Sequence, residues 1–335
     1  SITKSAHMVI HPEDIRYHLE KALYMAATGR PGPVWLDIPL DVQGAIIETE
    51  SLRAYDPAEN PEQRPQEILQ KAIEKILDKI EESHRPVLSP GNGVRLAGAI
   101  KEFHELVDVL GVPVVTGMSS VDALESAHPY FVGRSGGTGT RPGNFALQNS
   151  DVLLSIGNRQ GFAQTGFQYQ DWARESYTIL NDIDENELKK PNLHVSLPVV
   201  GDAGELIRGL LAEAKKRGAD KGHPLFKGED WRKQCLLWKE KYPAVTEKHY
   251  ETLEEGCTNI YAFYGELSKA MKENENLMVS VGTSRVAGSQ AFQVKKGQRF
   301  ITNPNTASMG FCLPAATGIA VAQPGKAVAC VTTAL

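Results

Sequence analysis

Gly29-Arg-Pro-Gly-Pro-Val-Trp-Leu-Asp-Ile-Pro-Leu-Asp-Val42 is the stretch that decides the fold of this chain. Before it, apolar residues between Ile15 and Ala26 recur at helical spacing, and Pro12 suits the first position of that helix. Gly29 suits a left-handed helix end, and residues 34–38 are apolar except for one Asp, as in a strand covered on both faces. The stretch therefore predicts a helix, a Gly/Pro corner and a buried strand.

The composition is that of an ordinary globular protein. The chain has 335 residues, 41% hydrophobic and 23% charged, which is enough for two or three domains. A net charge of −5 offers no basic stripe for nucleic acid, and no apolar run approaches the ~20 residues of a membrane span. Residues 1–30 lack the basic start and apolar core of a signal peptide. We therefore expect a cytoplasmic protein that acts on a small molecule and binds neither nucleic acid nor membrane.

The cysteines have no metal-binding spacing, which predicts reduced thiols. Two of them lie in apolar segments and are expected in the core. The four are Cys235, Cys257, Cys312 and Cys330, and the expected core pair is Cys312 and Cys330.

Two polar stretches, residues 48–68 and 217–229, divide the chain into three pieces. Elsewhere short apolar runs alternate with helical periodicity, which predicts doubly wound, mostly parallel sheets that bind ligands beyond the carboxyl ends of their strands. In the middle piece we expect strands at 86–89, 112–116, 152–156 and 177–180, and helices at 96–110 and from 203. In the last piece we expect helices at 259–271 and 313–321, and strands at 277–281, 299–302 and 327–332.

The opening stretch resembles the segment that closes the first domain of acetolactate-synthase-like, thiamine-diphosphate-dependent enzymes. A second stretch, Thr306-Ala-Ser-Met-Gly-Phe-Cys-Leu-Pro-Ala-Ala316, is similar to the family's Gly-Thr-Met-Gly-Tyr-Gly-Leu-Pro-Ala-Ala. The resemblance spans nearly the whole chain. It implies the family's consecutive doubly wound α/β sheets with incomplete first and third domains, so we expect an internal fragment. The implied parts are the end of the pyrimidine-binding first domain at 1–50, a linker at 51–68, a central Rossmann-like domain at 69–216, and a linker with the start of the diphosphate-binding third domain at 217–335.

In the middle piece the resemblance implies a site for FAD, as in the acetolactate synthases, or for ADP, as in some relatives. The implied contacts follow predicted strands, where backbone amides can meet a phosphate. They are Gly91, Gly93, Arg159, Asp182, Asp184, Gly201 and Asp202. This chain has Ser135 where FAD-binding members usually carry His, and Gln160-Gly-Phe-Ala163 where they continue with Phe-Asp-Asp-Arg. The alternative is that the glycines only make tight turns and that the domain holds no nucleotide.

In the last piece the resemblance implies thiamine diphosphate. In the family, the backbone around Ala307 and Met309 meets the aminopyrimidine ring, and the methionine wedges between the two rings, a role that suits a large unbranched side chain. Gly282, Thr283 and Ser284 occupy the place where the family's loop holds the diphosphate, and a helix start suits an anion. The alternatives are a core methionine and an ordinary Ser/Thr helix cap.

Two essential parts of the family's site do not occur in this sequence. The activating Glu lies in the first domain, upstream of Ser1 in the resemblance. The Gly-Asp-Gly motif that holds Mg²⁺ should follow the strand at 327–332, where Thr333-Ala-Leu335 stands. We therefore expect no catalytic residue and no metal ligand in this chain, and no turnover by it alone. Arg285-Val286 also replaces the Gln-His of the acetolactate synthases.

For the full-length parent the resemblance implies a transferase or lyase that uses thiamine diphosphate and Mg²⁺. It would convert a 2-oxo acid such as pyruvate to an enamine and add this to an acceptor carbonyl, in a homodimer or homotetramer whose sites lie between subunits. Another family activity stays open, of the sulfoacetaldehyde acetyltransferase, oxalyl-CoA decarboxylase, glyoxylate carboligase or cyclic-diketone hydrolase type. So does a non-catalytic nucleotide-binding fragment. The sequence does not select the 2-oxo acid or the acceptor.

Overall fold

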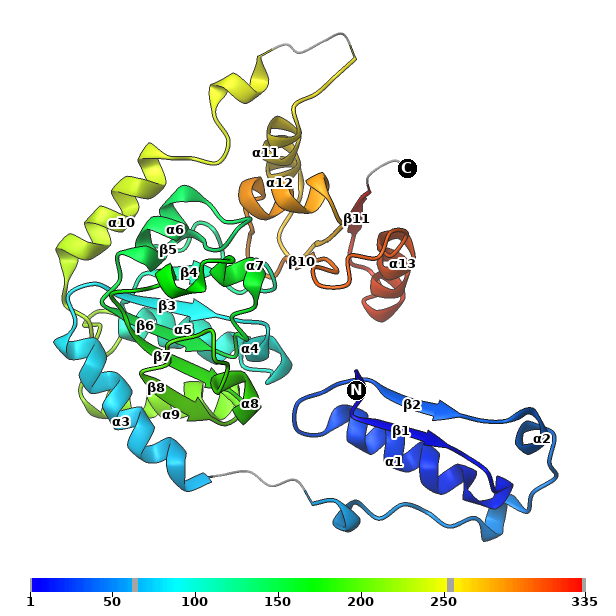
Figure 1. Ribbon diagram of the computed structural model, residues 1–335. Coiled ribbons are helices and arrows are strands. Elements are labelled where there is room, and N and C mark those ends of the chain that lie inside the picture. The colour runs from blue at the N-terminus through cyan, green and yellow to red at the C-terminus, as the bar shows by residue number, and fades with distance from the viewer. Residues whose placement is uncertain (1, 62–65, 252–255, 333–335) are drawn as a thin grey trace. The chain divides into compact units, whose positions relative to one another are not determined.

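Two units make up the chain in the computed structural model, one of residues 1–65 and one of residues 66–335 (Figure 1). The structure describes residues 2–61, 66–251 and 256–332. Every strand pairing in these ranges is parallel. The expected α/β class with parallel sheets is therefore confirmed.

The first unit packs a helix against two parallel strands, β1 (Ser5–Met8) and β2 (Val34–Asp37). The helix α1 (Ile15–Ala27) follows the 3-10 turn η1 (Pro12–Asp14), and Gly29 comes after its end with a left-handed φ of 58°, as expected. The expectation of a strand covered on both faces is wrong among the described residues, because Trp35 of β2 is 64% exposed. Three short elements follow, α2 (Leu40–Gln43), η2 (Thr49–Ser51) and η3 (Pro57–Glu59).

Part of the expected linker at 51–68 packs on the first unit. Tyr55 is buried there, and its ring centroid lies 5.6 Å from those of Tyr17 and Tyr24, which belong to α1. Residues 62–65 of the expected linker lie outside the described residues. The division between the two units falls inside the expected linker, but its first half is a folded part of the first unit.

The second unit contains a six-stranded parallel sheet in the order β5-β4-β3-β6-β7-β8. The order reverses between β3 and β6, so the sheet is doubly wound and a ligand is expected beyond the carboxyl ends of these two strands. β3 to β6 are buried along their whole length, as strands covered on both faces should be. The six strands are β3 (Pro86–Pro90), β4 (Val114–Thr116), β5 (Phe131–Arg134), β6 (Val152–Ile156), β7 (Tyr177–Asp182) and β8 (Leu197–Val200).

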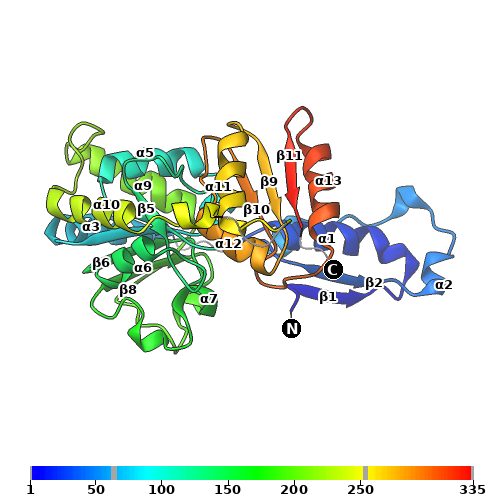
Figure 2. The same cartoon turned by 90° about the horizontal axis from the view of Figure 1, so that it is seen from above.

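Helices cover both faces of this sheet. α5 (Ile100–Leu110) and α9 (Ala203–Lys216) pack side by side on one face, and α9 also contacts α3 (Gln66–Glu82). On the other side lie α6 (Arg141–Gln148) and α7 (Phe162–Thr165) (Figure 2). The expected helix at 96–110 is wrong at its start, because the short helix α4 (Gly93–Leu96) ends there and the left-handed Gly98, with φ of 66°, separates it from α5.

A helix that the sequence places outside the central domain packs on its core. α10 (Glu229–Lys241) carries Trp231 and Cys235 into the central cluster of buried side chains. The Trp231 indole N–H donates to the carbonyl oxygen of Pro86, at the start of β3, with an N···O distance of 3.0 Å. The segment before α10 adds two more core residues, Leu225 and Phe226. Four side chains of residues 225–235 therefore complete the central core, although they follow the boundary expected after residue 216.

The last part of the chain forms a three-stranded parallel sheet in the order β10-β9-β11. Successive side chains of β9 point to opposite faces, so Leu277 and Val279 pack in the cluster with α11 and α12, and Met278 packs with α13. The Asn259 side chain accepts the Tyr261 amide proton at 2.9 Å and caps α11. The elements are α11 (Ile260–Ala270), β9 (Asn276–Val279), α12 (Thr283–Ala291), β10 (Arg299–Ile301), α13 (Cys312–Ala322) and β11 (Val328–Val331).

The structure also bears on three expectations from composition. In the described ranges no helix is long and apolar enough to cross a membrane. All four cysteines are free thiols, and burial raises the pKa of Cys235 to about 12, which makes it unreactive. Cys312 is buried as expected, whereas Cys330 is exposed, so the expectation of a core residue is wrong for Cys330.

Candidate functional site

The start of α12 lies at the carboxyl edge of the three-stranded sheet. Gly282 follows β9 with φ of 74° and ψ of −145°, a backbone conformation that residues with side chains rarely adopt. A Cβ at Gly282 would meet nothing within 4 Å among the described residues, so the space beside it is open. Thr283 is exposed in the first turn of α12, whereas Ser284 is buried. An anion at this helix start would therefore meet backbone amides and the Thr283 hydroxyl.

The loop between β10 and α13 presents an exposed methionine. Met309 is 77% exposed, so the alternative that it is a core residue is wrong for the described chain. Ala307 adopts a positive φ of 53°, which is uncommon for a residue with a side chain, and Gly310 follows with φ of 79°. Thr302 leaves β10 with its hydroxyl oxygen buried and without a hydrogen-bond partner among the described residues.

These two segments leave the same edge of the sheet. β10 and β9 are neighbours and parallel, so Gly282 and Thr302 follow the carboxyl ends of adjacent strands. β11 flanks β9 on its other side, and the amide of Ser280 donates to the carbonyl oxygen of Val331 at 2.8 Å. The structure thus brings the sequence-predicted residues 282–284 and 307–309 to one edge, where α/β sheets bind their ligands.

The geometry at this edge fits the organic part and the diphosphate of thiamine diphosphate. The positions beside Gly282 and Gly310 are open, the Met309 side chain stands out of the surface, and α12 starts with free space before it. In the described ranges, no group of three or more His, Cys, Asp or Glu side chains could hold a metal ion. Binding of Mg²⁺ stays a prediction.

Gly91 and Gly93 lie where the central sheet reverses direction. A Cβ on Gly91 would stand 2.1 Å from the carbonyl oxygen of Gly157, and a Cβ on Gly93 would stand 2.7 Å from the Gly157 Cα. The Gly93 amide donates to the same Gly157 oxygen at 2.9 Å. Both glycines are therefore required for the close approach of the loops after β3 and β6, whether or not a ligand binds there.

The other predicted contacts of the central domain gather beyond the ends of β6, β7 and β8, and most of their side chains have protein partners. Asp202 accepts the amide protons of Gly204 and Glu205 at 2.9 and 3.1 Å and caps α9. Asp184 caps α8 (Glu185–Leu188) through the Asn186 amide at 3.0 Å. Asp182 accepts the Asp184 amide proton at 3.0 Å, and the Gly201 amide donates to the Asp182 carbonyl oxygen at 3.0 Å.

Arg159 is held by a carboxylate from α8. Its Nη2 lies 2.6 Å from Glu187 Oε1, and Lys190 Nζ donates to the Arg159 carbonyl oxygen at 2.9 Å. Lys190 also pairs with Glu187, so one buried carboxylate faces two cations. The Arg159 guanidinium is thus paired with a carboxylate of the protein itself. A nucleotide at this edge stays a prediction.

Two buried side-chain amides, of Gln160 and Asn181, lie at the same carboxyl edge of the central sheet, and the sequence did not predict either as a site residue. Gln160 adopts a positive φ of 50° and donates from Nε2 to Ser155 Oγ at 2.8 Å, which leaves its Oε1 without a partner in the described chain. Asn181 donates to the carbonyl oxygens of Val199 and Gly201 and leaves its Oδ1 unpartnered in the same way. Leaving a buried acceptor unpaired costs free energy, so both oxygens suit a ligand or water donor. A polar residue directly after or at the end of a buried strand is the signal that could find them.

Arg134, which precedes Ser135, joins two parts of the second unit. Its guanidinium is buried at the end of β5, where Nη2 donates to the Phe292 carbonyl oxygen at 2.9 Å and Nη1 to that of Gln290 at 3.3 Å. Burial lowers the pKa of Arg134 to about 10, so the side chain stays charged at neutral pH. A cation from the central sheet thus binds the backbone at the carboxyl end of α12.

Two sequence families match this chain. "Thiamine pyrophosphate enzyme, central domain" matches residues 73–210, which include the six-stranded sheet. "Thiamine pyrophosphate enzyme, C-terminal TPP binding domain" matches residues 280–333, which include Gly282 and Met309. The matches therefore cover both edges described above.

Curated relatives align with nearly the whole chain. It is 27% identical over 338 residues to the acetolactate synthase isozyme 3 large subunit of Escherichia coli, which is 99% of this chain and 56% of that protein. It is 30% identical to the probable acetolactate synthase large subunit of Methanocaldococcus jannaschii, covering 99% of this chain and 55% of that protein. It is 31% identical to the acetolactate synthase large subunit of Corynebacterium glutamicum, covering 98% and 50%. The chain thus spans about half the length of these relatives. It belongs to the thiamine pyrophosphate enzymes, carries sequence of their central and cofactor-binding C-terminal domains, and is a distant homologue of acetolactate synthase large subunits.

Proposed function

We propose that this chain is part of an enzyme that decarboxylates a 2-oxo acid with thiamine diphosphate and adds the remaining fragment to an acceptor carbonyl. The observation that carries the proposal is the carboxyl edge of the three-stranded sheet, where the open turn at Gly282 and the exposed Met309 leave adjacent strands. This edge lies in the segment that matches the thiamine-pyrophosphate-binding domain. The names of the relatives support the reaction type, because all three are acetolactate synthase large subunits.

The start of α12 is the part that would hold the diphosphate. α12 has nine residues, and the first N–H groups of a helix have no partner within it, so they donate to an anion that also lies at the positive end of the helix dipole. The exposed Thr283 hydroxyl adds a donor that can rotate toward a phosphate oxygen. The buried Ser284 would act through its backbone amide rather than its hydroxyl.

The loop before α13 would orient the rings. The left-handed turns at Ala307 and Gly310 hold Met309 out from the sheet, and its unbranched apolar side chain can support a ring without making a directed polar bond. Thiamine diphosphate, when bound, supplies the nucleophilic carbon and the electron sink that no amino-acid side chain offers. In this proposal Mg²⁺ completes the diphosphate site, the substrate is a small 2-oxo acid, and the protein is a homodimer or homotetramer.

The test is an assay of the protein that contains this chain together with the parts that its relatives have beyond it. We expect consumption of pyruvate and formation of acetolactate that require both thiamine diphosphate and Mg²⁺, and no turnover by residues 1–335 alone. The test variant is Thr283→Val, which keeps the shape of the side chain and removes its hydroxyl. It should raise the concentration of thiamine diphosphate needed for half-maximal rate. The proposal would be overturned if this protein decarboxylated none of the three substrates pyruvate, glyoxylate and oxalyl-CoA.

A further inference from the structure

A cavity of about 290 Å³ lies between the central sheet and the three-stranded sheet. The central part contributes Arg95 of α4, Lys101 and His104 of α5, and residues of the loop after β4. The other wall comes from Asn274, which precedes β9, and from residues 294–299, which end at the first residue of β10. The cavity is therefore built from segments that are far apart in the sequence and meet only in the folded second unit.

The cavity lies at the opposite edge of the three-stranded sheet from the proposed thiamine site. Asn274, Gly297 and Arg299 line it at the amino ends of β9 and β10, whereas Gly282 and Met309 follow the carboxyl ends of these strands. The four residues of β9 span roughly 13 Å at 3.3 Å per residue. A ligand in the cavity is thus distinct from one at the thiamine site.

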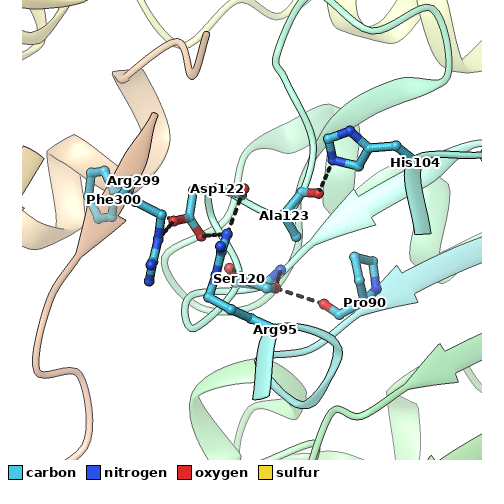
Figure 3. Close-up of polar contacts among 9 residues, drawn as sticks. Pro90, Arg95, His104, Ser120, Asp122, Ala123, Arg299 and Phe300 are labelled. Carbon is cyan, nitrogen blue, oxygen red and sulfur yellow. Dashed lines mark hydrogen bonds and ion pairs between the residues drawn. The ribbon is translucent and has the colours of Figure 1, made fainter. Parts of the chain in front are cut away.

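One carboxylate in the wall is shared by two arginines (Figure 3). Asp122 is nearly buried, and its Oδ2 accepts from Arg299 Nε at 2.8 Å and from the Phe300 amide at 3.1 Å. Its Oδ1 lies 3.2 Å from Arg95 Nη2. Each guanidinium carries five N–H donors, and these contacts use only a few of them. The side chains of Arg95 and Arg299 stay 24% and 32% exposed, so their other donors can reach a ligand.

The remaining charges of the lining are mostly positive. Lys101 and Lys296 are exposed and have no carboxylate partner among the described residues. Lys295 donates to the carbonyl oxygens of Met271 and Lys269, which do not neutralise it. Against five Lys and Arg side chains the lining offers two carboxylates, from Asp122 and Glu125. The whole chain has a net charge of −5, so this excess of cations is local.

The first turn of α5 adds polarity of the same sign. His104 Nε2 faces the Ala123 carbonyl oxygen at 2.9 Å (Figure 3). Its Nδ1 lies 3.7 Å from the Glu125 carboxylate. α5 starts at the cavity with Ile100 and Lys101, and Ala99 before it provides no side-chain cap. The positive end of this helix therefore lies at the cavity wall.

We propose that this cavity binds a small phosphate ester and that the ligand joins the central sheet to the three-stranded sheet. The excess of Lys and Arg donors fits a dianionic phosphate, and arginine presents paired donors to phosphate oxygens. A cavity of about 290 Å³ is at the lower end of ligand-site volumes, which fits a compact monophosphate rather than a dinucleotide. Because both walls contribute cations, bound phosphate stabilises the second unit against unfolding.

The experiment titrates inorganic phosphate into the chain by calorimetry at constant ionic strength and records the melting temperature in parallel. Succinate, a dicarboxylate, is the comparison ligand, and the titrations are run at about pH 8, where phosphate and succinate are both dianions. The test variant is Lys101→Gln/Lys296→Gln, which changes two exposed side chains of the cavity and spares the Asp122 cluster. The matched control is Lys326→Gln, an exposed lysine outside the cavity. Circular dichroism confirms that each variant folds.

We expect phosphate to bind at millimolar concentration or tighter, to raise the melting temperature more than succinate does, and to lose about tenfold in affinity in the double variant and none in Lys326→Gln. Absence of phosphate binding, or equal binding by the double variant, would overturn the proposal. So would tighter binding of succinate. A loss of phosphate affinity in Thr283→Val instead would place the phosphate at the start of α12 and would also overturn it. Thiamine diphosphate is not needed, so the result is independent of the proposed function.

Discussion

At the scale of single residues, Met309 connects backbone strain to a proposed role. The residue two positions before it, Ala307, has a positive φ, a conformation that residues with a Cβ adopt at a cost of order 1–3 kcal/mol. The side chain that this turn presents is 77% exposed and so contributes little to the core. Strain without a packing benefit indicates that the loop is shaped for binding.

We predict that Met309→Ala separates binding from stability. The free energy of unfolding should change by less than about 0.5 kcal/mol, because the side chain is exposed, whereas a core methionine would cost about 2–5 kcal/mol. In the protein that contains this chain, turnover should fall by up to ~100-fold if the ring shifts by about 1 Å, and Met309→Leu should retain most of it. Denaturant melts and turnover per folded enzyme measure the two effects. Unchanged turnover in Met309→Ala would remove the residue from the site.

At the scale of elements, α10 shows how a helix with a polar sequence belongs to a buried core. Most of its residues are charged or polar, but Trp231 and Cys235 lie four positions apart on one face and are buried in the central cluster. The Trp231 indole also satisfies the carbonyl of Pro86 at the start of β3. The helix therefore closes the edge of the central sheet and is not a connector.

We predict that Trp231→Ala lowers the free energy of unfolding of the second unit by about 3–5 kcal/mol, because it leaves a cavity and an unpaired carbonyl. Lys233→Ala, on the exposed face of the same helix, should change it by less than about 0.5 kcal/mol. Urea denaturation monitored by circular dichroism gives both values. A polypeptide of residues 66–241 should also be more stable than one of residues 66–216. Equal stabilities would show that α10 is dispensable to the central core.

At the scale of the whole second unit, the charged side chains of Arg134 and Asp122 hold the central sheet to the last part of the chain. Arg134 binds the carbonyl oxygens of Phe292 and Gln290, and Asp122 binds Arg299 and the amide of Phe300. Val121, next to Asp122, is buried in the cluster that α11, α12 and β9 form. Polar and apolar contacts thus reinforce each other at this junction.

We predict that Arg134→Ala lowers the free energy of unfolding by about 1–3 kcal/mol and divides the thermal melt of the second unit into two transitions. The variant leaves two backbone carbonyls without their donor, and weaker coupling between the parts ends two-state behaviour. Differential scanning calorimetry measures both effects. Arg141→Ala, which removes an exposed arginine of α6, is the control and should melt as the unsubstituted chain does. A single transition in Arg134→Ala, at the temperature of the control, would contradict the prediction.

The sequence by itself determined the class of fold, most of the strands and the cofactor segment. Apolar β-branched runs and the glycines after them are local signals, so the sequence predicts the strand at 152–156 with its exact bounds. The stretch at 306–316 resembles the family's motif closely enough to be informative, because this combination of residue types is uncommon. The sequence also placed residues 282–284 and 307–309 at strand ends, and adjacency of β9 and β10 brings both to one edge.

Only the tertiary structure decided what those residues and their neighbours contact. The helical spacing of apolar residues continues across Gly98, because one residue with a left-handed backbone does not interrupt that spacing. The sequence of α10 is mostly polar, so it gives little sign that two of its side chains lie in the core. Lys101 and Lys296 line the same cavity although they are nearly two hundred positions apart in the sequence. No local sequence pattern predicts that two such distant residues lie close together. Burial and long-range hydrogen bonds, such as those of Asp122 and Arg134, arise only when the sheets pack, because they are properties of pairs of segments and not of either segment alone.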